Sequence, residues 1–423
     1  MLTPAGQGMS TRRRVGACRI EGAMVSSDRR RSSDMPEHPE GQMRIETVST
    51  EPAFEGLADA WDELVTAMPR PSPFLLNSWL AEWWRHYGED RDLAVLVAFR
   101  GERLVAALPL CIYRRLGLGV LEFVGGSEAA PLADLMLARG ENSGAAAAVV
   151  ERVAESSHDF ASLFGLPRDS RLVSALPSDA LHLVERLEAP VLDMHEGWEA
   201  VYETKVSAKA RSDRRRRRRQ LEAIGALDVS VARTPAELEP ALDEAFRLHD
   251  LRWSGRRDPS EFGTPKGRSF YRAAVLQLAE RNLSRLVTVR LDRRPVAFAL
   301  YLQLAGALYG VTTAFDPAYA RSAPGSEAIF SSLEAASEEG IERAEFLGAA
   351  ADHKRRFTDR SDPIYQGLGF AGTARGRVAA EALIAGIRLR RRAKRSKTAQ
   401  RLYYRLPRGV SLPNLSSERG HND

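Results

Sequence analysis

The chain has very little cysteine and no apolar segment long enough to cross a membrane. Its 423 residues include only two cysteines, Cys18 and Cys111, which excludes a disulfide framework and a cysteine-rich metal site. No apolar run approaches the roughly 20 residues that span a bilayer, and residues 1–42 lack the apolar core of a secretory signal. We therefore expect a cytoplasmic protein.

The usual short motifs of nucleotide and metal enzymes are also missing. The sequence contains no phosphate-binding P-loop, no G-x-G-x-x-G after a predicted strand, no G-x-S-x-G and no H-E-x-x-H. The eight histidines are scattered without the spacing of metal ligands. We therefore expect no metal cofactor.

The basic character of the chain is concentrated in two short tracts. Residues 375–409 carry a net charge of +11 and residues 205–219 one of +8, so the remaining residues sum to −14 although the whole chain is +5. A nucleic-acid-binding fold usually spreads its basic residues over one face. The composition therefore argues against nucleic acid as a partner of the core fold.

The order of predicted elements divides the chain into five parts. These are a disordered basic segment at 1–42, a first domain at 43–196, a basic linking helix at 197–226, a second domain at 227–374, and a basic helix and tail at 375–423. Strands, helices and a hairpin follow one another in a similar order in both domains, without a close sequence repeat. This pattern predicts an α/β fold with mixed sheets, built from two related domains in tandem.

Local patterns also predict individual elements. Trp79, Trp83 and Trp84 recur at helical spacing, which is more typical of a core than of a ligand cage. Residues 198–224 read as one long helix that ends before Gly225, and a further short helix is predicted at 352–357.

The segment from Thr312 to Phe330 is the most informative one for function. It joins a predicted buried strand to a helix that begins at Pro324, and Gly325 allows close approach of the backbone. Free N–H groups of the first helical turn bind anions, and Arg321 adds positive charge. The same pattern also fits an ordinary strand–loop–helix connection, so both interpretations stay open.

Residues 74–370 carry a set of short motifs in a particular order. The motifs are Leu108-Pro-Leu, Leu121-Glu-Phe-Val-Gly, a basic helix at 211–225 ending in Leu-Glu-x-x-Gly, Leu248-His-Asp-Leu-Arg-Trp, Pro295-Val-Ala, Phe315-Asp-Pro-Ala-Tyr-Ala-Arg-Ser-Ala-Pro-Gly, Glu338-Glu-Gly through Gly348, and Lys354-Arg-Arg-Phe. With these motifs the chain resembles the CelD/BcsL-type acetyltransferases. They are a branch of the GNAT superfamily that is also similar to the FemAB peptidyltransferases.

The resemblance implies a tandem GNAT fold and transfer of an acetyl group from acetyl-CoA to an amine or hydroxyl. It implies a small-molecule or saccharide acceptor, a precursor of cell-surface polysaccharide. In the superfamily the turn before the helix holds the CoA pyrophosphate, which corresponds here to Arg321, Ser322, Pro324, Gly325 and Ser326. The turn departs from the family's G-x-G/A in having Ala-Pro-Gly. Glu345 stands where the family often has Asp, and His353 where it often has Tyr.

Attack on a thioester needs a base, a donor for the oxyanion and a proton for the departing sulfur. Under the resemblance, a backbone N–H among Thr312, Thr313 and Ala314 is the expected oxyanion donor. We expect the base to be one of His249, Asp316 and His353, each of which also has an ordinary structural interpretation. The residues expected to bind the acceptor are Arg252, Trp253, Tyr319 and Lys354.

The two basic tracts allow further interpretations. Residues 214–219 cover more than one helical turn and cannot all share a face, so we expect a solvated helix exterior. In residues 383–408 an apolar stripe leads into a polybasic stretch and two tyrosines, which suits an anionic membrane surface or a disordered tail.

Two other functions remain compatible with the sequence. One is a FemAB-like transferase that takes its donor group from aminoacyl-tRNA, with a basic helix on the RNA. The other is a non-catalytic GNAT-like module that binds RNA or lipid through its basic tracts.

Overall fold

The structure, a computed structural model, describes residues 43–141, 143–253, 260–347 and 358–395. The predicted disordered segment at 1–42, the short helix at 352–357 and the tail beyond 395 lie outside these residues. The described chain forms a four-stranded and an eleven-stranded sheet with helices against them, which confirms the predicted mixed α/β class.

The smaller sheet belongs to the first half of the chain and has the order β1-β3-β4-β7. Its strands are β1 (Met43–Val48), β3 (Val95–Arg100), β4 (Arg103–Leu108) and β7 (Met136–Leu137). The accompanying helices are α1 (Glu51–Glu55), α2 (Ala58–Ala67), η1 (Pro73–Leu75), α3 (Asn77–Tyr87), α4 (Gly126–Ala129), α5 (Ser143–Ala154) and α6 (Arg171–Ala175). Trp79 and Trp83 of α3 are fully buried and Trp84 is partly buried against the same core, which confirms the prediction that the three belong to the core.

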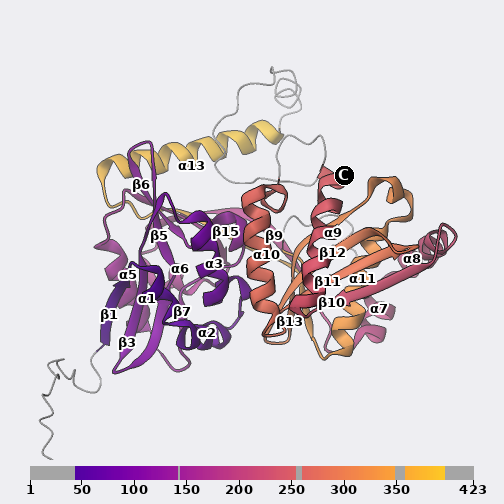
Figure 1. The fold of residues 1–423 in the computed structure, drawn as a ribbon. Helices are drawn as coiled ribbons and strands as arrows, with labels where there is room; N and C mark the ends of the chain where they lie inside the picture. The colour runs from indigo at the N-terminus through magenta and orange to yellow at the C-terminus, as the bar shows by residue number, and fades with distance from the viewer. Residues whose placement is uncertain (1–42, 142, 254–259, 348–357, 396–423) are drawn as a thin grey trace, which may run out of the picture. The chain divides into compact units, whose positions relative to one another are not determined.

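The larger sheet has the order β10-β11-β12-β13-β14-β9-β15-β8-β6-β5-β2. Figure 1 shows labelled strands of this sheet in both halves of the chain. The strands that precede residue 197 are β2 (Arg91–Leu93), β5 (Leu110–Arg115), β6 (Leu118–Phe123), β8 (Phe160–Pro167) and β9 (Leu181–Asp193). The later strands are β10 (Leu227–Ala232), β11 (Ser284–Leu291), β12 (Arg294–Leu304), β13 (Ala307–Phe315), β14 (Arg343–Glu345) and β15 (Arg360–Gly369). Strands from both halves of the chain therefore share one hydrogen-bonded sheet.

Strand β15 connects the two halves most directly. It comes from the region 227–374 but pairs antiparallel with β8 on one side and β9 on the other. Strand β9, from the first half, also pairs with β14, from the second half, so the sheet is continuous from one half of the chain to the other. The predicted domain boundaries along the chain stay a prediction.

Helices cover both faces of the second half of this sheet. They are α9 (Pro235–Trp253), η2 (Glu261–Gly263), α10 (Pro265–Ala279), η3 (Pro317–Ser322) and α11 (Pro324–Glu338). Alternate residues of β12 point to opposite faces, as the pleat requires. Phe298 and Leu300 join the core with α9 and α10, whereas Ala299 and Tyr301 join the core with α11.

The predicted single helix over 198–224 is wrong, because the chain breaks it at Val206 and Ser207. Helix α7 (Trp198–Lys205) ends where Val206 takes an extended backbone with φ −89° and ψ 115°. Helix α8 (Ala208–Glu222) begins after Ser207, whose Oγ accepts a hydrogen bond from the Ala210 N–H at 3.2 Å. Val206 is 2% exposed, so packing as well as the cap holds the break in place.

The last described helix, α13 (Ala374–Arg395), lies against β8 and β15. Within the described ranges no helix combines the length and the apolar composition needed to cross a bilayer. The same residues hold no group of three His, Cys, Asp or Glu side chains arranged to bind a metal ion.

Candidate functional site

The turn between β13 and α11 has a defined geometry. The Asp316 Oδ1 accepts a hydrogen bond from the Ala318 N–H at 3.0 Å, which starts η3. Ala323 then adopts a left-handed conformation with φ 46°, and Pro324 occupies the first turn of α11. A fifteen-residue helix thus begins in a tight turn that presents its N-terminal end to the preceding loop.

Gly325 is placed where a side chain would not fit easily. A Cβ atom at this position would lie 3.1 Å from Cδ1 of Phe315, the last residue of β13. The guanidinium of Arg252, from the end of α9, lies 5.0 Å from the centre of the same Phe315 ring. Arg252 and Gly325, both expected site residues, therefore lie beside the same side chain.

Strands β13 and β14 separate six residues before β13 ends at this turn. They pair in parallel from Ala307 to Tyr309, and then β13 continues to Phe315 while β14 ends at Glu345. The Asp316 N–H donates to the Val296 carbonyl at 2.8 Å, which sets the alternation of hydrogen-bonded pairs between β12 and β13.

This alternation determines which backbone groups face the separated side. Thr312 and Ala314 fall on the hydrogen-bonded positions facing β12, so the N–H of Thr313 points the opposite way, toward the side that β14 has left. Val311 forms a bulge in the pairing with β12 directly before this point. Among the three residues predicted to supply the oxyanion donor, Thr313 has the suitable orientation.

A pocket lies between α8 and the start of α11. Its walls include Ser322, Ala323 and Ser326 of the turn and one face of α8. That face contributes Arg214, Arg217 and Arg218, the i, i+3 and i+4 positions of a helix. The pocket thus combines the N-terminal end of a helix with three guanidinium groups.

A buried carboxylate organises two of these arginines. Glu327, in the first turn of α11, is 4% exposed and pairs with Arg214 Nε at 3.1 Å and with Arg218 Nη1 at 2.5 Å. Burial opposes the charge of Arg214, but its hydrogen bond and attraction to Glu327 outweigh burial and raise the Arg214 pKa. The Nε atom of Arg217 is buried and has no hydrogen-bond partner within the described part of the chain.

These contacts correct the prediction that 214–219 is simply a solvated helix exterior. The Arg214 side chain is only 13% exposed, whereas Arg215, Arg216 and Arg219 are exposed as expected. The prediction was wrong for Arg214 because α11 packs against this face of α8. A local sequence pattern does not show which element will pack against a given helix face. The role of Glu327 was missed for the same reason.

The predicted bases lie in different surroundings. His249 is 2% exposed, stacks on Trp253 with ring centres 5.8 Å apart, and lies beside Phe262 at 5.2 Å. Asp316 is 5% exposed and pairs with Arg294 at 3.1 Å while capping η3. His353 lies outside the described residues.

The other expected site residues divide into three groups. Ser322, Pro324 and Gly325 are buried in the turn, whereas Arg321 is exposed. Tyr319 is half-buried against the core that includes α11. Lys354 lies outside the described residues.

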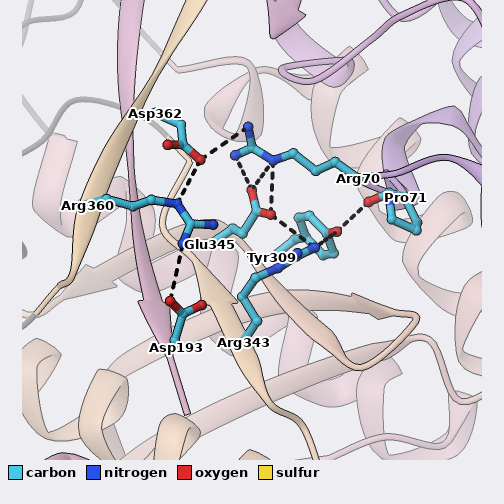
Figure 2. Close-up of polar contacts among 8 residues, drawn as sticks. All are labelled: Arg70, Pro71, Asp193, Tyr309, Arg343, Glu345, Arg360 and Asp362. Atoms are coloured by element: carbon cyan, nitrogen blue, oxygen red, sulfur yellow. Dashed lines mark hydrogen bonds and ion pairs between the residues drawn. The ribbon is translucent and has the colours of Figure 1, made fainter. Parts of the chain in front are cut away.

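A network of charges adjoins the point where β13 and β14 separate. Figure 2 shows Arg70, from the first half of the chain, directed at Glu345. The Arg70 Nε lies 3.1 Å from both carboxylate oxygens and its Nη2 lies 2.5 Å from Oε2. Arg343 Nη2 lies 3.3 Å from Oε1 of the same carboxylate, which is 1% exposed.

The same network contains Tyr309, the last residue of β13 that pairs with β14. Its hydroxyl donates to the Pro71 carbonyl. Burial, reinforced by the charge of Glu345, raises the pKa of Tyr309 to about 12. The β13–β14 pair is therefore tied to residues 70–71 immediately before it opens.

Comparisons with known proteins relate this geometry to a family. Residues 208–355 match the family model described as an acetyltransferase (GNAT) domain. No curated protein matches the chain. The match includes α8, the β13–α11 turn and β14, and it supports the prediction of a GNAT domain for this part of the chain.

Solved structures are similar in fold at low sequence identity. The crystal structure of FemX is 11% identical, with a TM-score of 0.53, and the match covers 78% of this chain and 97% of that one. The C-terminal domain of a putative lysylphosphatidylglycerol synthetase from Agrobacterium fabrum is 13% identical, with a TM-score of 0.49 and coverage of 79% and 96%. A tandem GNAT protein from the clavulanic acid biosynthesis pathway is 13% identical, with a TM-score of 0.45 and coverage of 78% and 99%.

Proposed function

We propose that the chain is an acyl-CoA-dependent N- or O-acyltransferase that binds the diphosphate of its donor between α8 and the start of α11. The observation that carries this proposal is the pocket itself. It joins Ser322, Ala323 and Ser326 of the turn to three arginines, and all of its lining except Val206 lies within residues that match a GNAT domain. Acetyl-CoA is the donor that the resemblance to the CelD/BcsL-type enzymes implies.

The charges of the pocket suit a diphosphate. Its three arginines face two carboxylates, those of Asp213 and Glu327, so the lining carries one excess positive charge. The N-terminal end of α11 adds the equivalent of about half a positive charge. Guanidinium groups bind phosphate oxygens in a bidentate manner, and Arg217 has a buried Nε for which the described chain provides no acceptor.

The separated strands suit the thioester. With the diphosphate at the start of α11, the acyl arm of the donor would extend into the opening between β13 and β14. The Thr313 N–H would then donate to the carbonyl oxygen as negative charge develops on it. Nucleophilic attack forms the new C–N or C–O bond and breaks the C–S bond, and the CoA thiolate leaves and takes up a proton.

The acceptor side would include Arg252, Trp253 and Tyr319. Arg252 contacts Phe315 at the end of β13, so it lies next to the proposed acyl position. The resemblance to the CelD/BcsL-type enzymes supports a saccharide or another small precursor of cell-surface polysaccharide as acceptor. His249, Asp316 and His353 remain the proposed bases, to be separated by the pH profiles of single variants.

Calorimetric titration of the full chain with CoA and with acetyl-CoA tests the donor. We expect both to bind, and Arg217→Gln to weaken both by about tenfold or more because a charge-assisted contact is lost. Arg219→Gln is the matched control, because this exposed arginine of the same helix does not line the pocket. If the wild-type chain binds neither compound, the acyl-CoA proposal is wrong.

The aminoacyl-tRNA alternative predicts a different outcome. A tRNA-dependent enzyme would bind tRNA with a steep dependence on salt. Neutralising the exposed Arg215, Arg216 and Arg219 would weaken that binding, whereas CoA would not bind at all. Binding without acetyl transfer to any amine or hydroxyl acceptor would instead support the non-catalytic module.

A further inference from the structure

The most exposed large apolar side chains of the described residues occur on two neighbouring elements. Leu116 is 93% exposed, Leu389 is 69% exposed and Val378 is 68% exposed. Leu116 lies in the turn between β5 and β6, and the other two lie on α13. Exposed apolar side chains that cluster on one surface mark a site of contact with another apolar phase.

The apolar residues of α13 form a continuous exposed stripe. Val378, Ala382, Ala385 and Leu389 are all exposed and are spaced by four, three and four residues. This spacing keeps them within a narrow sector of the helix surface. The helix therefore carries a second apolar face in addition to the one that it buries against the sheet.

The buried face of α13 connects it to the β5–β6 hairpin. Ala380 forms a small core with Val120 and Phe160, and Leu118 and Leu383 lie against it. Figure 1 shows α13 next to the β6 strand. Leu116 precedes Leu118 by only two residues, so the hairpin tip lies close to the helix.

The conformation of the hairpin tip holds Leu116 outward. Leu116 has φ 50° and the following Gly117 has φ 76°, so two successive left-handed residues make the turn. A leucine is an unusual residue for this conformation. The chain thus places a large apolar side chain at a tip where Asn, Asp or Gly is preferred.

Ionic contacts hold the start of α13 in place. Asp159 is buried and accepts hydrogen bonds from Arg375 Nε at 2.7 Å and from Thr373 Oγ1 at 2.6 Å. Further along, Arg388 Nη2 lies 3.3 Å from His182 Nε2 of β9, beside the partly exposed Leu183. The exposed stripe therefore belongs to a helix that contacts the rest of the fold at its start and again at Arg388.

Positive charge surrounds these apolar side chains. Arg114 and Arg115 directly precede Leu116, and on α13 the exposed Arg377 and Arg388 directly precede Val378 and Leu389. The last turns of α13 have the sequence Arg-Arg-Arg-Ala-Lys-Arg, and Glu381 is the single acidic residue of the whole helix. The charge complements an anionic surface, and the apolar residues require that this surface also offer hydrocarbon.

We propose that α13 and the β5–β6 tip form a docking face for an anionic lipid bilayer. This docking face is defined by Leu116, Val378, Ala382, Ala385, Leu389 and their arginine neighbours. The leucine and valine side chains enter the headgroup region while the arginines remain at the phosphates. RNA would satisfy the arginines but would leave the apolar stripe in water. The proposal does not depend on acyl-CoA as the donor.

Vesicle flotation of the full chain tests the docking face. The probes are vesicles of phosphatidylcholine alone and vesicles that also contain phosphatidylglycerol. We expect binding to the phosphatidylglycerol vesicles that decreases with salt. Leu116→Ser and Leu389→Ser should each lower the partition coefficient by about tenfold, because each removes one inserted apolar side chain.

Ile224→Ser is the matched control, because Ile224 is 53% exposed but lies at the end of α8, outside the docking face. It should leave the partition coefficient unchanged. Absence of binding to phosphatidylglycerol vesicles would overturn the proposal, and so would equal binding by the wild-type chain and both leucine variants. Displacement of the chain from vesicles by a single-stranded RNA oligonucleotide, with the leucine variants binding that RNA as well as the wild type does, would assign this face to RNA instead.

Discussion

Replacing Arg70 by methionine should destabilise the chain strongly, because it leaves a buried carboxylate without its main partner. Glu345 is 1% exposed and receives three close approaches from Arg70, at 3.1, 3.1 and 2.5 Å. Methionine keeps most of the apolar stem and removes only the guanidinium. Removing one partner of a buried ion pair costs about 3–5 kcal/mol. Since Arg343 remains 3.3 Å from Glu345, we expect about 3 kcal/mol.

Urea unfolding followed by circular dichroism and by tryptophan fluorescence measures this loss. Arg360→Met is the matched control, because Arg360 is 49% exposed and its partners Asp193 and Asp362 are 34% and 30% exposed. An exposed ion pair contributes less than about 1 kcal/mol, so the control should change little. The two probes should agree if the described sheet unfolds as one unit.

A double variant shows whether the loss of stability comes from the lost attraction between Arg70 and Glu345 or from the buried charge that Glu345 is left with. Adding Glu345→Gln to Arg70→Met removes the buried negative charge and should recover part of the lost stability. The reasoning is refuted if Arg70→Met costs no more than Arg360→Met. It is also refuted if Glu345→Gln destabilises the Arg70→Met chain further, since the carboxylate would then not be the source of the cost.

Three further changes test other features of the fold by urea unfolding. Burial raises the pKa of Glu122 from 4.5 to about 7, so the native state binds the proton more tightly and stability falls as pH rises across this range. Glu122→Gln should therefore raise the free energy of unfolding by about 3 kcal/mol at pH 8 and leave it unchanged at pH 4; equal pH slopes in both proteins would contradict this. Gly165→Ala should cost about 2 kcal/mol or more, because Gly165 has φ 99° and the new Cβ would lie 2.8 Å from the Ala130 carbonyl; a cost near zero would show that the backbone can shift there. Ser207→Ala should cost about 1 kcal/mol through loss of the α8 cap, whereas Ser207→Asp should keep most of it; equal losses would count against capping.

Local patterns predicted a large part of the fold. The hairpin predicted in each domain is present, as β3–β4 and as β11–β12, and Trp79 and Trp83 lie on the buried face of α3 as their helical spacing indicates. These features depend on residues close in sequence, whose backbone conformations and burial are set by their own side chains. The break of the 198–224 helix was missed because the basic residues on both sides of Val206 are good helix formers, and only the burial of Val206 and the Ser207 cap interrupt them.

The candidate site was predicted in part. The β13–α11 turn, with Pro324 entering the helix, is present as expected. The structure adds that a side chain at Gly325 would meet Phe315. The sequence analysis did not connect the arginines of α8 or the carboxylate of Glu327 with this turn. The arginines and Glu327 line the same pocket, but about a hundred residues separate them along the chain. A glutamate in the first turn of one helix and a run of arginines in another can be recognised as partners only when the two helices are known to be in contact.

The sequence by itself determined the α/β class, the position of the turn before α11 and the division of charge between an acidic body and two basic tracts. The tertiary structure decided which arginines of α8 face a pocket, how β15 joins the strands of the first half, and where Arg70 meets Glu345. Each of these depends on contacts between residues far apart in the chain. Spacing along one element determines which side chains share a face, but what that face meets depends on how the elements pack.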